Sequence, residues 1–299
     1  MTDVYENIEF ESERATLRGR FHRSENRGAA LVVLAHGFSA TAHMSINAFA
    51  ARLAGAGYHV LAYDHRNFGT SDGEPRYAVD QWCQIRGYSD AITCALDLDG
   101  VETDHVVVWG ESMGGGTVHF VGAFDPRVTA VIAHTPGCGA EYVEPAADSS
   151  DFTAMKTFWL DGDLTDEPAA SVAVRFADLP TSEAPVILNF EAARDYATTY
   201  GQRTESLWSN DVNVITRKAP ELSVPVAAAQ LAVPTLYVVA SDDEVAVAAP
   251  AVARQCFDSI AAAKNWTDID GGHFGLLYED SELFHRAVDA DLAFLAEHL

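Results

Sequence analysis

The chain has 299 residues, of which 48% are hydrophobic and 21% are charged. This composition is typical of a soluble globular protein, and it excludes a largely disordered chain, a collagen-like chain and a small disulfide scaffold. The 44 acidic residues outnumber the 19 Lys and Arg residues, which gives a formal net charge of −25. Such a chain repels phosphate backbones and anionic membranes, so we expect neither a nucleic-acid partner nor a membrane partner. A halophilic source and a GC-rich genome that favours Arg over Lys both account for the acidity.

The cysteines show neither a CxxC spacing nor a tight cluster with histidines. We expect Cys83, Cys94, Cys138 and Cys256 to be buried thiols of a cytoplasmic protein. The first residues, Met1–Phe10, carry three acids and no apolar core, so we do not expect them to form a signal peptide. The uncharged run Leu222–Ser241 contains two prolines, and we interpret it as a loop that leads into a buried strand.

The N-terminal residues alternate between polar and apolar side chains up to about residue 23, which predicts two antiparallel strands joined near Ser12–Arg14. Continuous apolar runs then alternate with helical patterns, and this arrangement predicts a mostly parallel sheet of about eight strands covered by helices. The expected strands are AALVVLAHG, HVLAYD, HVVVWG, VTAVIAH, PTLYVVAS and NWTDID, and the expected helices cover residues 45–56, 79–98, 113–123, 248–260 and 282–298.

The alternation stops after Pro136. Residues 139–228 contain prolines, acidic clusters and many aromatic side chains, and we predict a mostly helical cap inserted between two parts of one α/β core, residues 1–138 and 229–299. The aromatic residues of the cap either line an apolar pocket or pack the cap itself. They are Tyr142, Phe152, Phe158, Trp159, Phe176, Phe190, Tyr196, Tyr200 and Trp208.

The strongest chemical signal is Gly110-Glu111-Ser112-Met113-Gly114, a G-x-S-x-G pattern that follows a predicted strand and begins a predicted helix. A serine on such a sharp strand-to-helix turn is exposed for attack on a carbonyl carbon, and the helix N-terminus directs free N–H groups toward developing negative charge. Ser112 is therefore the candidate nucleophile.

Three further motifs occur along the chain, each in a predicted loop. They are His36-Gly37-Phe38 after one strand, Asp64-His65-Arg66-Asn67-Phe68-Gly69-Thr70-Ser71 after the next, and Gly271-Gly272-His273-Phe274 near the C-terminus. Together with the serine motif, they resemble the α/β-hydrolase superfamily, and more closely its dienelactone-hydrolase-like and esterase-like branch. The resemblance covers the chain outside the cap and implies an α/β-hydrolase fold.

A nucleophilic serine needs a base near pKa 7, and His273 is the candidate. A carboxylate must orient this imidazole. The resemblance places it in the acidic loop after PTLYVVA, where the family's spacing falls on Asp243; Asp242 is the alternative, and Glu244 adjoins them.

The family's oxyanion hole consists of backbone N–H groups, which here correspond to Phe38 and Met113. Arg66 is expected to hold its loop by hydrogen bonds to carbonyls or carboxylates. The remaining candidate histidines, His36, His65, His119 and His134, are expected to pack in the core or in loops.

These observations predict a serine hydrolase that cleaves a carboxylic ester of a small, largely apolar molecule through an acyl-enzyme. Thioester hydrolysis, carbon–carbon bond cleavage and acyl transfer use the same triad, and a non-catalytic small-molecule-binding protein is the alternative of another class. The sequence contains no metal-ligand cluster and no nucleotide loop, so we expect no metal and no cofactor. The expected partner is the small-molecule substrate, and a homo-oligomer is compatible with the sequence.

Overall fold

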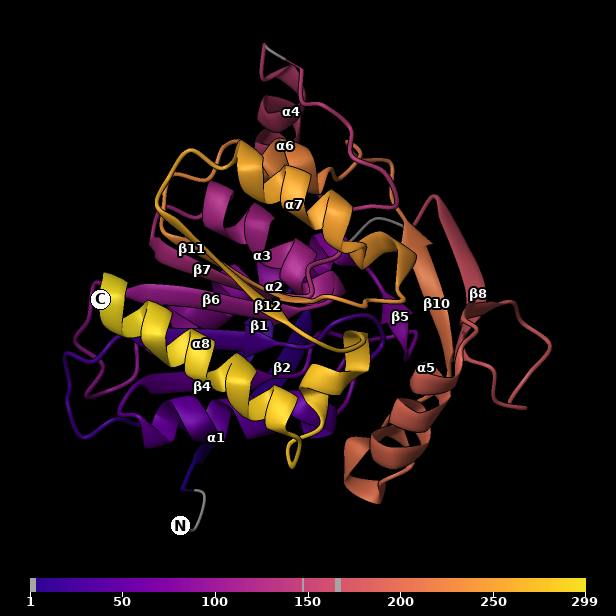
Figure 1. Cartoon of the computed structure of the whole chain (residues 1–299), viewed down its shortest axis with the longest axis horizontal. Helices are drawn as coiled ribbons and strands as arrows, with labels where there is room; N and C mark the ends of the chain where they lie inside the picture. The colour runs from indigo at the N-terminus through magenta and orange to yellow at the C-terminus, as the bar shows by residue number, and fades with distance from the viewer. Residues whose placement is uncertain (1–3, 147, 165–167) are drawn as a thin grey trace.

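An eight-stranded sheet forms the centre of the described part of this computed structural model, which comprises residues 4–146, 148–164 and 168–299 (Figure 1). The strand order is β1-β2-β4-β3-β6-β7-β11-β12, and β2 runs opposite to the other strands of this sheet, which are parallel to one another. The bounds are β1 (Glu6–Ser12), β2 (Ala15–His22), β3 (Leu31–Ala35), β4 (His59–Tyr63), β6 (Val106–Glu111), β7 (Val128–His134), β11 (Thr235–Ala240) and β12 (Lys264–Ile269). The predicted mostly parallel sheet is confirmed. Met1–Asp3, at the start of the chain, lie outside the described residues.

The apolar runs of the sequence explain the central position of these strands. Every residue of β3, β4 and β6 is buried, because helices cover both faces of the parallel part of the sheet. In contrast, β1 alternates between exposed and buried residues at its C-terminal end, as expected for a strand with only one covered face.

Five helices flank the sheet in the described chain. In Figure 1, α1 and α8 lie on one face, whereas α2, α3 and α7 lie on the other. Their bounds are α1 (Asn47–Gly55), α2 (Gln81–Leu96), α3 (Met113–Phe124), α7 (Pro250–Ser259) and α8 (Glu282–His298). All five agree with the predicted ranges to within a few residues. A single π-helical turn (Ala42–Ile46) leads into α1.

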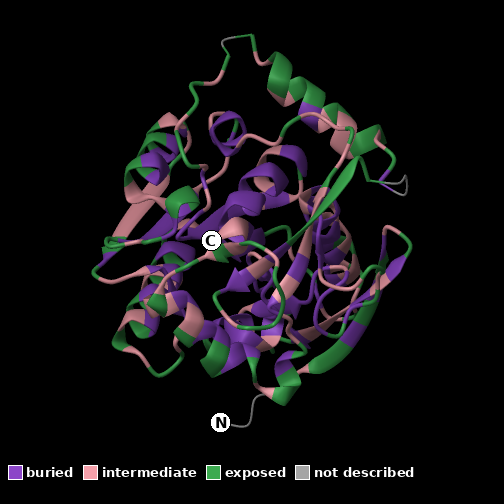
Figure 2. Cartoon of the chain, turned by 90° about the vertical axis from the view of Figure 1, so that its right-hand side faces the viewer, coloured by how far each residue is buried: buried purple, intermediate pink, exposed green. Residues whose placement is uncertain are grey.

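Two apolar layers fill the space between the helices and the sheet, and Figure 2 shows the buried residues gathered in the strands and on the inner helix faces. Phe49, Trp109 and Phe284 meet in the layer under α1 and α8. Tyr88 and Phe120 belong to the layer under α2, α3 and α7. These aromatic side chains fix how the helices pack on the strands.

The segment 139–228, which we call the insert, contains the predicted helices and, in addition, strands that were not predicted. The elements are α4 (Ser150–Asp161), β8 (Ala170–Ala177), β9 (Val186–Leu188), α5 (Glu191–Tyr196), β10 (Asp211–Thr216) and α6 (Val224–Ala228), with short helical turns at Ala197–Gly201 and Thr204–Ser206. Residue 147 and residues 165–167 of the insert lie outside the described residues. β10 pairs with β8 and with β5 (Ala78–Val79), both distant in sequence, so local patterns did not predict this sheet.

The insert is joined to the core by a second sheet of order β5-β10-β8-β9, in which β5 (Ala78–Val79) belongs to the core. β5 pairs with β10 in parallel. Next to this pairing, Asp80 caps α2 through the Cys83 amide, and its other carboxylate oxygen lies 2.6 Å from Arg217 Nε. Both side chains of this ion pair are at least nine-tenths buried. The pairing and the ion pair together fix the insert against the end of α2.

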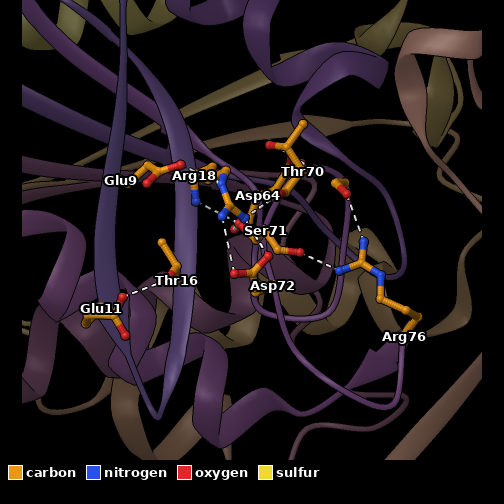
Figure 3. A network of polar contacts seen from close by, with 10 residues as sticks. Glu9, Glu11, Thr16, Arg18, Asp64, Thr70, Ser71, Asp72 and Arg76 are labelled. Atoms are coloured by element: carbon orange, nitrogen blue, oxygen red, sulfur yellow. Dashed lines mark hydrogen bonds and ion pairs between the residues drawn. The ribbon is translucent and has the colours of Figure 1, made fainter.

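The loop that follows β4 is held by a network of polar contacts (Figure 3). The Asp64 carboxylate accepts hydrogen bonds from the amide and the hydroxyl of Thr70. The guanidinium of Arg76 donates to the carbonyls of Gly69 and Ser71, and Arg18 binds the Thr70 carbonyl and the Asp72 carboxylate. This role was predicted for Arg66.

The prediction for Arg66 is not met. Its Nε atom is buried without a hydrogen-bond partner, and among the described residues no hydrogen bond joins its guanidinium to the loop. Arg76 and Arg18 hold the loop instead.

The four cysteines are free thiols; Cys83, Cys138 and Cys256 are buried, and Cys94 is half-buried. No helix in the described part of the chain is both long enough and apolar enough to cross a membrane.

Candidate active site

The candidate nucleophile lies on a strained turn between β6 and α3. Ser112 has φ = 56° and ψ = −122°, a conformation that non-glycine residues rarely adopt. Three main-chain hydrogen bonds hold it there: the Ser112 amide donates to the His134 carbonyl at 2.9 Å, and the Ser112 carbonyl accepts from the amides of Gly116 and Gly137. The surrounding structure thus enforces the strain, which lifts the hydroxyl out of the strand.

Small residues around Ser112 allow this turn. A Cβ atom on Gly110 would lie 2.3 Å from the Gly114 carbonyl oxygen, and one on Gly114 would lie 3.0 Å from the His36 carbonyl oxygen. Side chains at either position would push the start of α3 away from β6 or from the end of β3. The glycines of the motif therefore permit close backbone approach.

The structure brings three of the predicted side chains into one hydrogen-bonded chain. His273 Nε2 lies 3.0 Å from Ser112 Oγ, and His273 Nδ1 lies 2.7 Å from Asp243 Oδ2. Asp243 is fully buried and His273 is nearly so. Because a carboxylate only accepts, Nδ1 carries the proton and Nε2 is free to accept one from the serine.

The three acidic residues of the loop after β11 have different environments. Asp243 Oδ1 accepts the Val245 amide, which fixes the carboxylate under the imidazole. Glu244 accepts the main-chain amide of His273 at 2.9 Å and so positions the start of the 3₁₀ turn His273–Leu277. Asp242 is exposed, and no hydrogen bond joins its side chain to His273 among the described residues. Of the two predicted alternatives, only Asp243 lies against His273.

The two predicted oxyanion-hole residues lie beside Ser112. Phe38 and Met113 both line the same cavity as the serine hydroxyl. Met113 is the first residue of α3, so its N–H has no acceptor within the helix, and no main-chain acceptor is found for Phe38 N–H among the described residues. Both amides are available to bind an oxygen atom.

A cavity of about 550 Å³ opens at Ser112. The core contributes Phe38, Met113 and Phe120 to its walls, and the insert contributes Leu188, Val214 and Val224. The charged residues that line it are Glu141 and Glu221, and no Lys or Arg lines it among the described residues. The cavity is therefore apolar inside and acidic at its exposed edge.

The nine aromatic residues of the insert do not line this cavity. They pack against the two apolar layers instead, and Tyr196, for example, stacks on Phe274 with 4.8 Å between ring centroids. Most of the apolar residues in the cavity walls are aliphatic, and no sequence motif identified them as lining residues.

The weaker histidine candidates are all fully buried. Burial lowers the pKa of His119 to about 4 and keeps His65 neutral by lowering its pKa well below the usual value. His134 binds Asp291 in the core. None of the four lines the cavity at Ser112. In the described residues, no cluster of His, Cys, Asp or Glu is suited to a metal ion.

One residue of the site was missed. Glu111 is 3% exposed, and its Oε1 accepts the Gly37 amide at 2.7 Å. Burial raises the pKa of this carboxyl, while His273, the Gly37 amide and His134 oppose the shift. A charged residue at the end of the otherwise apolar strand VVVWGE was the available signal.

Comparison with known proteins gives the family. A family model described as the alpha/beta hydrolase fold matches residues 30–280, most of the chain. The protein is a member of the α/β-hydrolase family. The predicted superfamily is thereby confirmed.

Two curated relatives of this α/β-hydrolase share about a third of their aligned residues. The quorum-quenching protein AidA of Acinetobacter baumannii is 37% identical over 131 residues, 44% of this chain and 43% of that protein. The thiohydrolase aneE of Aspergillus aculeatus is 37% identical over 142 residues, 47% of this chain and 44% of that protein. The matches thus span less than half of the length of these relatives.

The fold extends over the whole α/β-hydrolase chain. The crystal structure of the alpha/beta hydrolase GrgF from Penicillium superposes with a TM-score of 0.75 over 99% of both chains, at 23% identity. This likeness covers the insert as well as the core.

Proposed function

We propose that this α/β-hydrolase is a serine hydrolase that cleaves carboxylic esters with a small, largely apolar acyl group. The observation that carries the proposal is the hydrogen-bonded chain from Ser112 through His273 to Asp243 at the base of an apolar cavity. No metal and no cofactor is needed for this chemistry.

In the first step, Ser112 Oγ attacks the ester carbonyl carbon while His273 Nε2 takes the hydroxyl proton. The carbonyl oxygen becomes an oxyanion, which accepts hydrogen bonds from the amides of Phe38 and Met113. The imidazolium, held by Asp243, then gives its proton to the leaving alkoxide. An alcohol departs and the acyl group remains on Ser112.

In the second step, His273 takes a proton from water, and the hydroxide oxygen attacks the acyl carbonyl carbon. The same two amides bind the second oxyanion. The proton returns from His273 to Ser112 Oγ as the carbon–oxygen bond breaks, which releases the acid and restores the enzyme.

Thioester hydrolysis is the second candidate, because the same steps apply with a thiolate as leaving group. The partial similarity to the thiohydrolase aneE favours it. Acyl transfer and carbon–carbon bond cleavage also use such a triad. Hydrolysis rates for an aryl butyrate ester and a butyryl thioester separate the first two reactions. Product analysis with a β-diketone tests carbon–carbon bond cleavage, and product analysis with an added alcohol tests acyl transfer.

Covalent labelling with a fluorophosphonate tests the proposal. Intact mass and peptide mapping should find a single adduct on Ser112 in the wild type and none in Ser112→Ala. A folded wild-type protein that is neither labelled nor active on any ester or thioester would favour the alternative of a non-catalytic binding protein.

A further inference from the structure

Glu111 occupies a place between the nucleophile and the oxyanion loop that the mechanism above does not use. It is the last residue of β6 and directly precedes Ser112. The strands β3 and β6 pair in parallel with Ala35 opposite Gly110, so the loop after β3 passes next to the Glu111 side chain. This loop carries Phe38, one of the two oxyanion donors.

The carboxylate of Glu111 fixes this loop through one hydrogen bond and close packing. Its Oε1 accepts the Gly37 amide at 2.7 Å. A Cβ atom on Gly37 would lie 2.8 Å from Oε1 and 3.0 Å from Oε2, so the carboxylate fits directly against the glycine backbone. Gly37 is buried, and a buried amide without an acceptor is costly. The position of the loop therefore depends on this side chain.

The groups that surround Glu111 are catalytic or structural rather than cationic. Burial raises the pKa of Glu111, and His273 of the 3₁₀ turn and His134 of β7 oppose this rise. Burial also raises the pKa of Tyr196 of α5 and of Tyr88 of α2, and Glu111 adds to both shifts. No Lys or Arg of the described chain forms an ion pair with it. Glu111 therefore lies next to Ser112 without a cationic partner among the described residues. Its hydrogen bond with Gly37 N–H indicates a structural role for the side chain.

We propose that Glu111 is a positioning residue of the oxyanion hole. By accepting a hydrogen bond from Gly37 N–H, it holds the peptide that follows, so that Phe38 N–H points at the oxyanion formed on Ser112. This inference rests on the proposed serine-hydrolase function. It assigns the effect to the hydrogen bond that Glu111 accepts, and not to its charge.

The test compares Glu111→Ala and Glu111→Gln with the wild type, with p-nitrophenyl butyrate as substrate. A misplaced oxyanion donor weakens transition-state binding more than substrate binding, so Glu111→Ala should lower kcat by about 10- to 100-fold with little change in KM. Gln retains a carbonyl oxygen for Gly37 N–H and should restore kcat to within about threefold of the wild type. Asp242→Asn, which removes a nearby exposed charge, is the matched control and should leave kcat unchanged.

A second measurement covers the case in which Glu111→Ala does not fold, as judged by circular dichroism. Binding of butylboronic acid, which forms a tetrahedral adduct on the serine, should be as tight in Glu111→Gln as in the wild type. An unchanged kcat in a folded Glu111→Ala, or a folded Glu111→Gln that loses at least about tenfold in kcat or in boronate affinity relative to the wild type, overturns the inference while leaving the proposed function intact. A wild type without labelling and turnover overturns both.

Discussion

Asp291 of α8 accepts a hydrogen bond from the side chain of His134, with 2.7 Å between Oδ1 and Nε2, and both side chains are fully inaccessible to solvent. The other carboxylate oxygen accepts the indole N–H of Trp109 at 3.0 Å. Because the His134 carbonyl holds the Ser112 amide, the C-terminal helix supports the strand ends that carry the nucleophile.

Loss of this carboxylate should destabilise the fold. Asp291→Ala leaves the N–H groups of Trp109 and His134 buried without acceptors, so we expect the free energy of unfolding to fall by about 3–5 kcal/mol. Urea denaturation followed by tryptophan fluorescence measures this. Asp289→Ala, at an exposed position of the same helix, is the control and should change the free energy of unfolding by less than about 0.5 kcal/mol. Equal effects of the two substitutions would contradict the assignment.

The buried acid of the triad should be separable from its exposed neighbour. Asp243→Asn keeps the shape of the side chain but no longer holds Nδ1 protonated and Nε2 free, so we expect kcat to fall by about 10³- to 10⁴-fold. Asp242→Asn should retain the wild-type kcat, because Asp242 does not contact His273. Steady-state kinetics on one aryl ester series decides this, and a large loss in Asp242→Asn would reverse the assignment.

The insert should determine the length of acyl chain that the enzyme accepts. Val214 of β10 lines the cavity, so Val214→Trp should fill part of it. We expect kcat/KM for p-nitrophenyl octanoate to fall by at least about tenfold relative to the acetate, because a long chain loses apolar contact. The control is Val172→Trp on β8, which is 54% exposed and does not line the cavity. An equal loss of kcat/KM for the octanoate and the acetate in Val214→Trp would indicate that the long acyl chain does not bind next to Val214.

The acidic edge of the cavity should disfavour anionic substrates. Two exposed carboxylates, Glu141 and Glu221, lie there, and no Lys or Arg of the described residues lines the cavity. We expect an aryl hemisuccinate to have a kcat/KM at least about fivefold below that of the aryl butyrate, which corresponds to about 1 kcal/mol of repulsion.

Salt and charge removal test the cause of this discrimination. The ratio of kcat/KM for the aryl butyrate to kcat/KM for the aryl hemisuccinate should decrease between 20 mM and 500 mM NaCl, because salt screens exposed charges. It should shrink likewise in the double variant Glu141→Gln/Glu221→Gln. A ratio that is insensitive to both would point to shape rather than charge.

The parts of the molecule that were predictable from sequence are those whose signals are local. The apolar run before Ser112 and the glycines after it specify strand, turn and helix within a dozen residues. His273 was found because its motif also lies within a short loop.

The parts that were not predictable depend on contacts between distant residues. β10 pairs with β8 and with β5, and β5 precedes Ser112 in the sequence whereas β10 follows it, so no local pattern indicates the second sheet. The same reason applies to the loop after β4. Arg66 belongs to the motif, but Arg76 and Arg18 reach the loop carbonyls because of how the chain folds back.

The pairing of β10 with β5, together with the ion pair of Asp80 and Arg217, bears on how molecules would reach Ser112. If the insert swung about a hinge as a flap, it would have to break main-chain hydrogen bonds and a buried charge pair in every cycle. We therefore expect molecules to enter and leave through an opening that is present at rest. The proposed turnover should then depend on fit to a preformed cavity and not on closure of the insert.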